Sequence, residues 1–376
     1  MSATHAKGCA ALLAGLPGMG PRRLRALLHD HDPAEAWERA TSGRVPDLAA
    51  LARPGAPATE LPSLAGSWKA FAGADPVAEA ERHAAAGVAI DLFDDPGYPA
   101  PLRSDPEPPP VVFSQGSPVG LDGPRVGVVG TRRCTPGGAA VARDLGRALA
   151  EVGVAVVSGL ALGIDGAAHE GALSAPDARP PVGVIGCGHD RPYPARHRSL
   201  WDAVRTRGLL VGEYPLGTSP ATWRFPARNR VIAGLADVVV VVESHQRGGS
   251  LLTVQEAVDR GVPVMAVPGS VRNPAASGTN QLLADGCAPV RDVDDLLVAL
   301  GLQVGARRRR VTESRPTPGP LGRDVLRALG WEPASLEQLV VRTGIALPEL
   351  SLVLHGLELD GWLTQDGPWY EQVQQA

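Results

Sequence analysis

Arginines are the residues of this sequence most suited to binding chemistry, and many of them stand beside glycines. Arg132 lies in the segment GTRR, and Arg228 and Arg230 enclose an asparagine in FPARNR. A guanidinium donates two parallel hydrogen bonds, a geometry that fits a phosphate. Residues 190–230 hold eight arginines, namely Arg191, Arg196, Arg198, Arg205, Arg207, Arg224, Arg228 and Arg230, and only three acids, Asp190, Asp202 and Glu213. This local patch predicts a polyanionic ligand.

The chain as a whole is not basic, since its 376 residues carry a formal net charge of -4. That length predicts two or three domains. The longest aliphatic run, VVVVV at 238–242, is far shorter than a membrane span, which predicts a soluble protein with no membrane span. The four cysteines show no CxxC or Cys/His spacing. This favours reduced thiols in a cytoplasmic protein over a disulfide framework or a structural zinc site.

Two ionisable residues, Asp165 and His169, are four apart and would share a helix face. The pair alone predicts no metal site, because no third ligand follows at a suitable spacing. A helix N-cap for Asp165 and a structural role for His169 are the simpler interpretations. The chain also lacks GxxxxGK[ST], so an ATPase is not expected. We expect no cofactor and no metal.

The middle of the chain alternates apolar runs of strand length with helical segments. The runs lie at 126–130, 154–159, 182–188, 209–213, 237–243, 262–269 and 288–290. Continuously apolar strands are typical of a parallel sheet that helices cover on both faces. The predicted fold class is therefore α/β, with a doubly wound, Rossmann-like domain over residues 79–302. Ligands of such sheets bind beyond the carboxyl ends of the strands.

Residues 1–78 are predicted to form a small helical domain of short helices. The segment LAGLPGMGPRRLRALL, at 13–28, places a glycine-rich hairpin between two apolar-periodic stretches and resembles a helix-hairpin-helix, as in SAM-like helical domains. The hairpin amides and the dipole of the second helix could hold one DNA phosphate, with Arg22 and Arg23 as a candidate second DNA contact. A helical bundle with a solvated basic face is the equal alternative.

The chain after the central domain divides into a linker and a small domain. Residues 303–320 are rich in Arg and Pro and predict a linker. Residues 321–376 show three helical stretches and a short hairpin, the pattern of a winged helix. Its third helical stretch contains Glu349 and Glu358 but no arginine or lysine. This charge favours a protein-interaction or regulatory role over DNA reading.

The motifs of residues 84–290 together resemble the DNA-processing protein A family (DprA, also called Smf). They are YPAPLRSDPEPPPVVFSQG, VGTRR, SGLALGIDGAAHEGAL, GVIGCGHDRPYP, FPARNRVIAGLADVVVVVES, GGSLLT, AVPGS and SGTNQLLADGC, in that order. The resemblance implies an extended Rossmann domain that binds single-stranded DNA, with double-stranded DNA as a further candidate. It also implies a homodimer formed through that domain. The implied role is to protect incoming strands in natural transformation and to load the RecA recombinase, without catalysis.

The resemblance also implies which residues bind DNA. Arg228 and Arg230 would face the phosphates of a single strand or shape the pocket that holds them, and Asp165 would shape the floor. The full implied set is Gly130, Thr131, Arg132, Ser158, Gly159, Asp165, Arg196, Arg198, Arg224, Phe225, Arg228, Asn229, Arg230, Gly248, Gly249 and Ser250. Where the family often has YPxxN and SGSL, this chain has His197 and GGSL.

A second resemblance suggests an enzyme. The Rossmann core is similar to the lysine decarboxylase-like nucleoside-monophosphate phosphoribohydrolases, whose motif is PGGxGTxxE. Thr253 and Glu256 keep the TxxE spacing, and a carboxylate could orient water at an oxocarbenium-like centre. However, Leu252 replaces the glycine before the threonine, and no proline precedes Gly248. The interpretation we favour is a shared loop without the chemistry.

Overall fold

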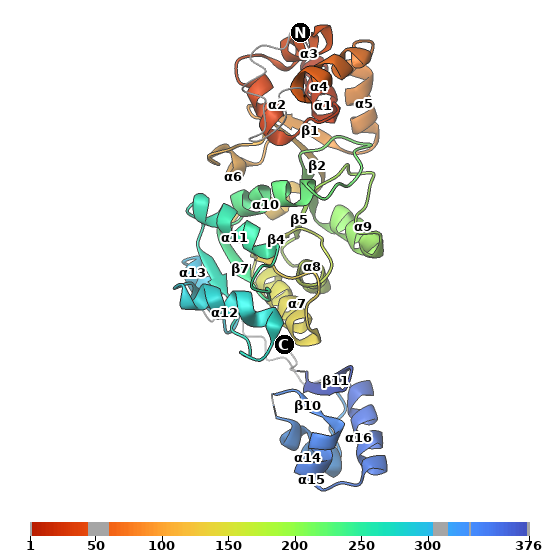
Figure 1. Cartoon of the computed structure of the whole chain (residues 1–376), viewed down its shortest axis with the longest axis vertical. Helices are drawn as coiled ribbons and strands as arrows, with labels where there is room; N and C mark the ends of the chain where they lie inside the picture. Colours follow the sequence, from red (N-terminus) through yellow and green to blue (C-terminus); the bar gives the residue numbers. More distant parts are fainter. Residues whose placement is uncertain (1, 44–59, 304–314, 331, 374–376) are drawn as a thin grey trace.

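The computed structural model describes residues 2–43, 60–303, 315–330 and 332–373. N-terminal helices, a central α/β sheet and a C-terminal winged helix follow one another along the described chain (Figure 1). Most of the predicted linker, including its run of four arginines at 307–310, lies outside the described residues.

A nine-stranded sheet forms the centre, in the order β1-β2-β6-β5-β4-β3-β7-β8-β9. The strands from β3 to β9 run parallel. They are β3 (Arg125–Val129), β4 (Ala155–Ser158), β5 (Val182–Ile185), β6 (Leu209–Gly212), β7 (Val238–Val241), β8 (Val264–Ala266) and β9 (Ala288–Pro289). These are the seven apolar runs that the sequence predicts as strands.

Two further strands, β1 (Ala89–Leu92) and β2 (Val111–Gly116), extend the sheet with antiparallel pairing next to β6. The sequence analysis did not predict them. β1 contains a charged residue, Asp91, and β2 follows three consecutive prolines, so neither stands out as a continuous apolar run.

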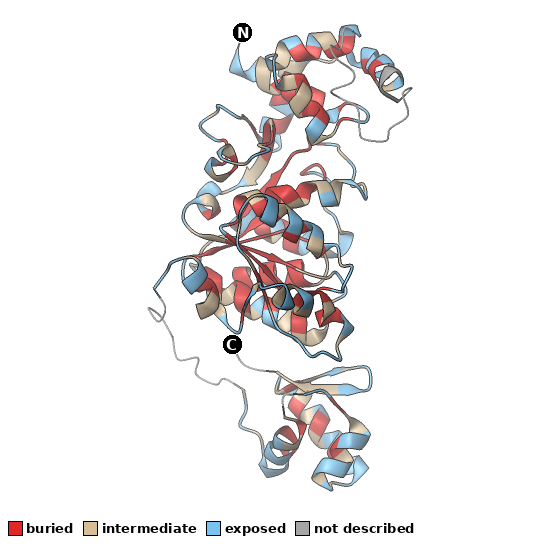
Figure 2. Ribbon diagram, turned by 60° about the vertical axis from the view of Figure 1, so that its left-hand side comes forward, coloured by how far each residue is buried: buried red, intermediate tan, exposed pale blue. Residues whose placement is uncertain are grey.

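Helices cover both faces of the sheet, which buries the strands (Figure 2). On one face α7 (Pro136–Glu151), α8 (Ile164–Ser174) and α13 (Val293–Ala299) share a core with β3, β4 and β7. The opposite face packs against α6 (Ala100–Arg103), α10 (Arg224–Leu235) and α11 (Ser250–Asp259), and the remaining helices of this region are α9 (Arg198–Arg207) and α12 (Ser277–Ala284). The predicted doubly wound, Rossmann-like fold is confirmed.

The N-terminal helices pack onto the antiparallel extension of the sheet. They are α1 (Ala3–Gly15), α2 (Pro21–Leu28), α3 (Pro33–Ser42), α4 (Glu60–Trp68) and α5 (Pro76–Ala85). Their core also includes Ile90 of β1 and Phe113 of β2. The predicted boundary between residues 78 and 79 falls within α5, and the division into domains stays a prediction.

The C-terminal unit has the predicted three helices and hairpin. Its elements are α14 (Pro320–Leu329), β10 (Ala334–Ser335), α15 (Leu336–Thr343), α16 (Leu347–Leu359), β11 (Leu363–Asp366) and β12 (Trp369–Gln372). β10 was not predicted and completes a three-stranded sheet in the order β10-β12-β11. Among the described residues, no single helix is long and apolar enough to cross a membrane, and α15 with α16 would reach such a length only as a pair bent by 110°.

Candidate nucleic-acid interface

The chain order of the sheet reverses at β3, with β4 on one side and β7 on the other. In open α/β sheets, this reversal point is where ligands bind, beyond the carboxyl ends of the strands. Gly130 to Arg133 follow β3, Gly159 to Gly163 follow Ser158 at the end of β4, and Glu243 to Gly249 follow β7 and lead into α11 at Ser250. The predicted loops therefore lie at one edge of the sheet.

An arginine and two aromatic rings meet at this edge. Arg132 is exposed, and its guanidinium carbon lies 5.4 Å from the centre of the Phe225 ring. Phe225 stacks on Tyr193, with ring centroids 5.0 Å apart and planes 24° apart. Tyr193 is 42% exposed. We call Arg132, Phe225 and Tyr193 the arginine–aromatic row. Through these residues, the segments that follow β3 and β5 contact the start of α10.

A glycine allows the ring of Phe225 to lie close to the sheet. A β-carbon built on Gly186, just after β5, would stand only 3.2 Å from Cδ1 of Phe225. Exposed arginines and accessible aromatic faces are the groups that hold the phosphates and stack the bases of single strands. The exposed Arg132 and the exposed ring of Tyr193 therefore offer both kinds of contact, and the half-buried Phe225 contacts both of them.

Further predicted arginines lie close to the row in the sequence. Arg196 and Arg198 are exposed where the chain enters α9, and between them Nδ1 of His197 lies 3.1 Å from the carbonyl oxygen of Leu160. Arg224 is half-buried, and its guanidinium lies 4.9 Å from the ring centre of Tyr214. Asn229 is half-buried on α10.

At the start of α7, where Rossmann folds often bind an anion, this protein places one of its own carboxylates. There, Thr135 donates its backbone N–H and its hydroxyl to the carboxylate of Glu243, at 2.8 and 2.7 Å. A β-carbon on Gly138 would stand 2.3 Å from that carboxyl carbon, and the N–H of Thr131 donates to the backbone carbonyl of Glu243. The protein's own carboxylate thus occupies the place where many Rossmann folds bind phosphate. Glu243 is not among the residues predicted from the sequence, where its only signal is that it ends the run VVVVVE.

The position of Arg228 corrects the prediction that it faces the phosphates of a single strand. It is only 4% exposed, so it does not face solvent, and its Nη1 donates to the backbone oxygens of Gly159, at 2.9 Å, and of Val184. Burial lowers the pKa of Arg228 to about 10. The other expected role remains, since Arg228 supports the loop after β4 from below.

The floor beneath this loop is made by Asp165 and Ser158. The N–H of Gly159 donates to the buried Asp165 carboxylate at 3.1 Å. Burial raises the pKa of Asp165, and Arg228 opposes that shift. The Ser158 hydroxyl is buried and donates to the carbonyl oxygen of Val128 at 2.6 Å. The Gly159 amide and the Ser158 hydroxyl are therefore engaged within the protein.

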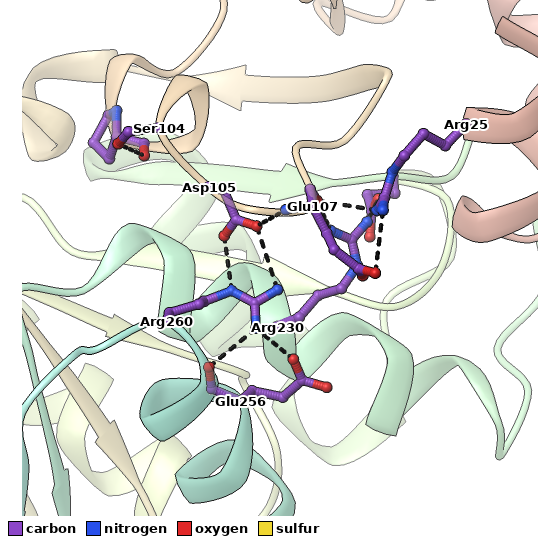
Figure 3. Close-up of polar contacts among 9 residues, drawn as sticks. Arg25, Ser104, Asp105, Glu107, Arg230, Glu256 and Arg260 are labelled. Atoms are coloured by element: carbon purple, nitrogen blue, oxygen red, sulfur yellow. Dashed lines mark hydrogen bonds and ion pairs between the residues drawn. The ribbon is translucent and has the colours of Figure 1, made fainter. Parts of the chain in front are cut away.

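Arg230 is also buried, since it is 7% exposed and forms a buried ion pair with Glu213, so of its two predicted roles the support of the pocket stays a prediction. Its Nη1 donates to the backbone oxygen of Glu107 at 2.6 Å. Figure 3 shows that Arg25 reaches the same residue from the N-terminal helices. Burial raises the pKa of Glu213, and the charge of Arg230 opposes this. Arg230 therefore joins β6, α10 and the loop before β2 and does not face a phosphate.

The glycine-rich turn before α11 exposes part of its backbone to solvent. Gly248 is half-buried and Gly249 is exposed, with no atom within 4 Å of a β-carbon built on it. Ser250 is buried and its hydroxyl donates to that of Ser244 at 2.9 Å. The adjacent Arg247 is exposed, and the sequence analysis missed it although it stands directly before the two glycines.

The two arginines of the predicted second DNA contact lie in different environments. Arg22 is exposed, whereas Arg23 is 6% exposed and its Nη1 donates to the backbone oxygen of Gly18 at 2.6 Å. Gly18 has a φ of 66°, which glycine adopts most readily. Arg23 closes the hairpin and is buried. The prediction that it contacts DNA required an exposed side chain, so the structure corrects that prediction.

The two residues that match the phosphoribohydrolase motif, Thr253 and Glu256, are held within the protein. Thr253 is buried, and the carboxylate of Glu256 accepts a 2.6 Å bond from Arg260, which also pairs with Asp105 at 2.8 Å (Figure 3). His169 is buried and its pKa is lowered to about 4 by burial, so it is neutral at pH 7. Among the described residues, no group of three or more His, Cys, Asp or Glu could hold a metal ion.

Comparison with known families agrees with this architecture. The model described as DNA recombination-mediator protein A matches residues 89–301. The chain belongs to the DprA (Smf) family. The DprA winged helix domain matches residues 309–367. Protein Smf of Synechocystis is 33% identical over 311 residues, which are 73% of this chain and 77% of that protein. DNA processing protein DprA of Bacillus subtilis is 37% identical over 54% of this chain and 68% of its own length.

Two solved DprA structures are similar. That of Streptococcus pneumoniae has a TM-score of 0.62 and 28% identity, covering 79% of this chain and 98% of that chain. The structure of the Helicobacter pylori protein, described for its single-stranded DNA binding mode, has a TM-score of 0.50 and 29% identity. It covers 57% of this chain and 95% of its own.

Proposed function

We propose that this DprA-family protein binds single-stranded DNA at the arginine–aromatic row. The observation that carries the proposal is that Arg132 lies over Phe225, which stacks on the exposed Tyr193. Each base that stacks on such a ring contributes about 1–3 kcal/mol, and every base has a face to stack. Phosphate contacts by arginine add affinity without sequence information. The relative from Helicobacter pylori, whose reported subject is a single-stranded DNA binding mode, supports the same ligand.

The predicted site residues divide into contacts and supports. Arg132, Arg196, Arg198 and Arg224 contact phosphates, with the backbone near Gly248 and Gly249, while Phe225 stacks a base beside Asn229. Gly130, Thr131, Ser158, Gly159, Asp165, Arg228, Arg230 and Ser250 shape the surface from beneath. This division follows from burial, because the second group is buried or directs its polar groups into the protein.

The biological role we propose is protection of incoming strands in natural transformation and loading of the RecA recombinase onto them. The protein acts in the cytoplasm as a homodimer joined through residues 79–302, its Rossmann-like domain. The relatives named DNA processing protein in Bacillus subtilis and Streptococcus pneumoniae, 37% and 38% identical, support this placement.

The protein binds DNA without hydrolysing a glycosidic bond. Glu256, the candidate catalytic carboxylate, is held by Arg260, and its partner Thr253 is buried. Incubation of purified protein with AMP should release no free adenine. Release of adenine at a rate proportional to the protein concentration would instead support phosphoribohydrolase activity.

A gel-shift comparison tests the DNA proposal. Single- and double-stranded oligonucleotides of equal length are compared across a salt series, and the single strand should bind more tightly at each concentration. Equal or tighter binding of the duplex would contradict the proposal. RecA loading is tested separately, by measuring whether the protein speeds RecA filament formation on strands already covered by a single-strand binding protein.

A further inference from the structure

Trp223 connects the start of α10 to the N-terminal hairpin. It is the residue directly before α10 and is 48% exposed, whereas Trp37, Trp68 and Trp201 are buried. A β-carbon built on Gly20, the last residue before α2, would stand 3.5 Å from the outer ring atoms of Trp223. Trp223 therefore keeps about half of its surface in solvent at the place where α10 meets the hairpin, and that part of the indole is available to a ligand.

One arginine contacts this indole, and a second follows Gly20, the residue next to which the indole ring lies. The guanidinium of Arg224 lies 5.0 Å from the ring centre of Trp223. On the hairpin side, Arg22 is exposed on the first turn of α2, two residues after Gly20. The surface around Trp223 therefore combines an accessible aromatic face with flanking positive charge, as the arginine–aromatic row does.

The hairpin is fixed against α10. Arg25 of α2 donates to the backbone oxygen of Glu107 at 3.0 Å, and Arg230 of α10 donates to the same oxygen at 2.6 Å (Figure 3). Nε1 of Trp68 donates to the backbone oxygen of Pro17 at 2.9 Å, which anchors the hairpin to its own domain. Arg22 and Trp223 are thus positioned relative to each other before any ligand binds.

We propose that Trp223 and Arg22 form a second stacking subsite, which takes nucleotides of the same single strand that occupies the arginine–aromatic row. Trp223 and Phe225 both stand at the start of α10, so a strand that passes this helix start can reach both rings, and Trp223 leads on to the hairpin at Gly20. The inference rests on the proposed function. It assigns the N-terminal helices a direct contact with the strand, through Arg22 and not through the buried Arg23.

Oligonucleotides of two lengths distinguish the subsite at Trp223 from the primary site at the arginine–aromatic row. Fluorescence anisotropy of labelled oligo-dT with full-length protein is measured for strands of about 4 and about 16 nucleotides, the limits of site size in stacking folds. Trp223→Ala should weaken the long strand by about 5- to 150-fold, the equivalent of one stacked base, and leave the short strand unchanged. Trp223→Phe should retain most of the affinity. Arg132→Ala should weaken both lengths.

Trp369→Ala is the matched control, because Trp369 is 44% exposed on the winged helix. Arg22→Glu is a second variant that leaves the indole in place and should weaken only the long strand. A result in which Trp223→Ala and Arg22→Glu both behave like the control, while Arg132→Ala weakens binding, overturns the subsite and leaves the proposed function standing. Equal loss at both lengths in Trp223→Ala also overturns it, since Trp223 would then belong to the primary site. Unchanged binding in Arg132→Ala contradicts the proposed function instead.

Discussion

Glu213, directly after β6, and Arg230, on α10, form an ion pair whose side chains are only 5% and 8% exposed. Loss of one partner leaves the other charge buried without compensation, which costs about 3–5 kcal/mol. Arg230→Met should therefore lower the free energy of unfolding by about that amount. Urea denaturation measures it, and the double variant Arg230→Met with Glu213→Leu should recover most of the loss.

The control for this pair is Arg143→Met, because Arg143 and Glu170 form a pair in which both side chains are 48% exposed. Exposed pairs contribute about 0–1 kcal/mol. If Arg230→Met were no more destabilising than Arg143→Met, the buried charge of Glu213 would not depend on Arg230 for compensation.

Arg132→Ala should weaken binding of single-stranded DNA without loss of stability, because the side chain is exposed. One lost phosphate contact should reduce the slope of log K against log salt by about 0.7. Affinities measured from low to moderate salt give both quantities. Arg143→Ala removes an exposed arginine from α7 and should leave the slope unchanged. An unaltered slope in Arg132→Ala would place the phosphate contacts elsewhere.

Phe225→Ala should weaken single-strand binding by about 5- to 150-fold, because a stacked base contributes about 1–3 kcal/mol. Phe225→Leu keeps an apolar side chain of similar size but has no aromatic face, so it should lose nearly as much affinity. Phe225→Tyr should bind nearly as well as the native protein. Full binding by Phe225→Leu would show that the residue acts by packing alone.

His169 and His189 predict an acid-sensitive fold, since burial lowers the pKa of each to about 4. The unfolded chain takes up protons at these histidines below pH 6.5, the ordinary value, whereas the folded chain does not. Their contribution to stability is fully present above pH 6.5 and is lost as the pH falls toward about 4.

Urea unfolding at a series of pH values between 7 and 4 measures this loss. His169→Leu should show a shallower decline than the native protein, whereas His355→Leu, at an exposed position on α16, should not differ from it. Identical pH profiles for native protein and His169→Leu would rule out a contribution from this histidine.

Truncation after about residue 304 should leave single-strand binding largely intact, because the arginine–aromatic row and the subsite at Trp223 both precede that point. α16 contains no lysine or arginine, so the winged helix lacks cations on its third helix. Affinity of the truncated protein is compared with that of the full chain at equal salt. Loss of most of the affinity would assign a primary DNA contact to the removed segment.

The sequence alone determined the seven parallel strands, the winged helix and the strand ends where the candidate site residues lie. These follow from local patterns, since a buried parallel strand must be apolar throughout and the loops after such strands meet at one edge. It did not determine which arginines reach solvent. Arg132, in the loop after β3, and Arg228, on α10, are the same residue type and both were predicted to bind DNA, yet Arg132 is exposed and Arg228 is buried.

That difference depends on neighbours far away in the chain. Arg228 is buried because the backbone oxygens of Gly159, which follows β4, and of Val184, in β5, converge on its guanidinium. Arg230 is buried because Glu213 and the loop at Glu107 meet it. Likewise, only the packing of the hairpin on α10 brings Gly20 to Trp223. Burial of a charge is settled by which donors and acceptors the tertiary structure places around it, and local sequence does not contain that information.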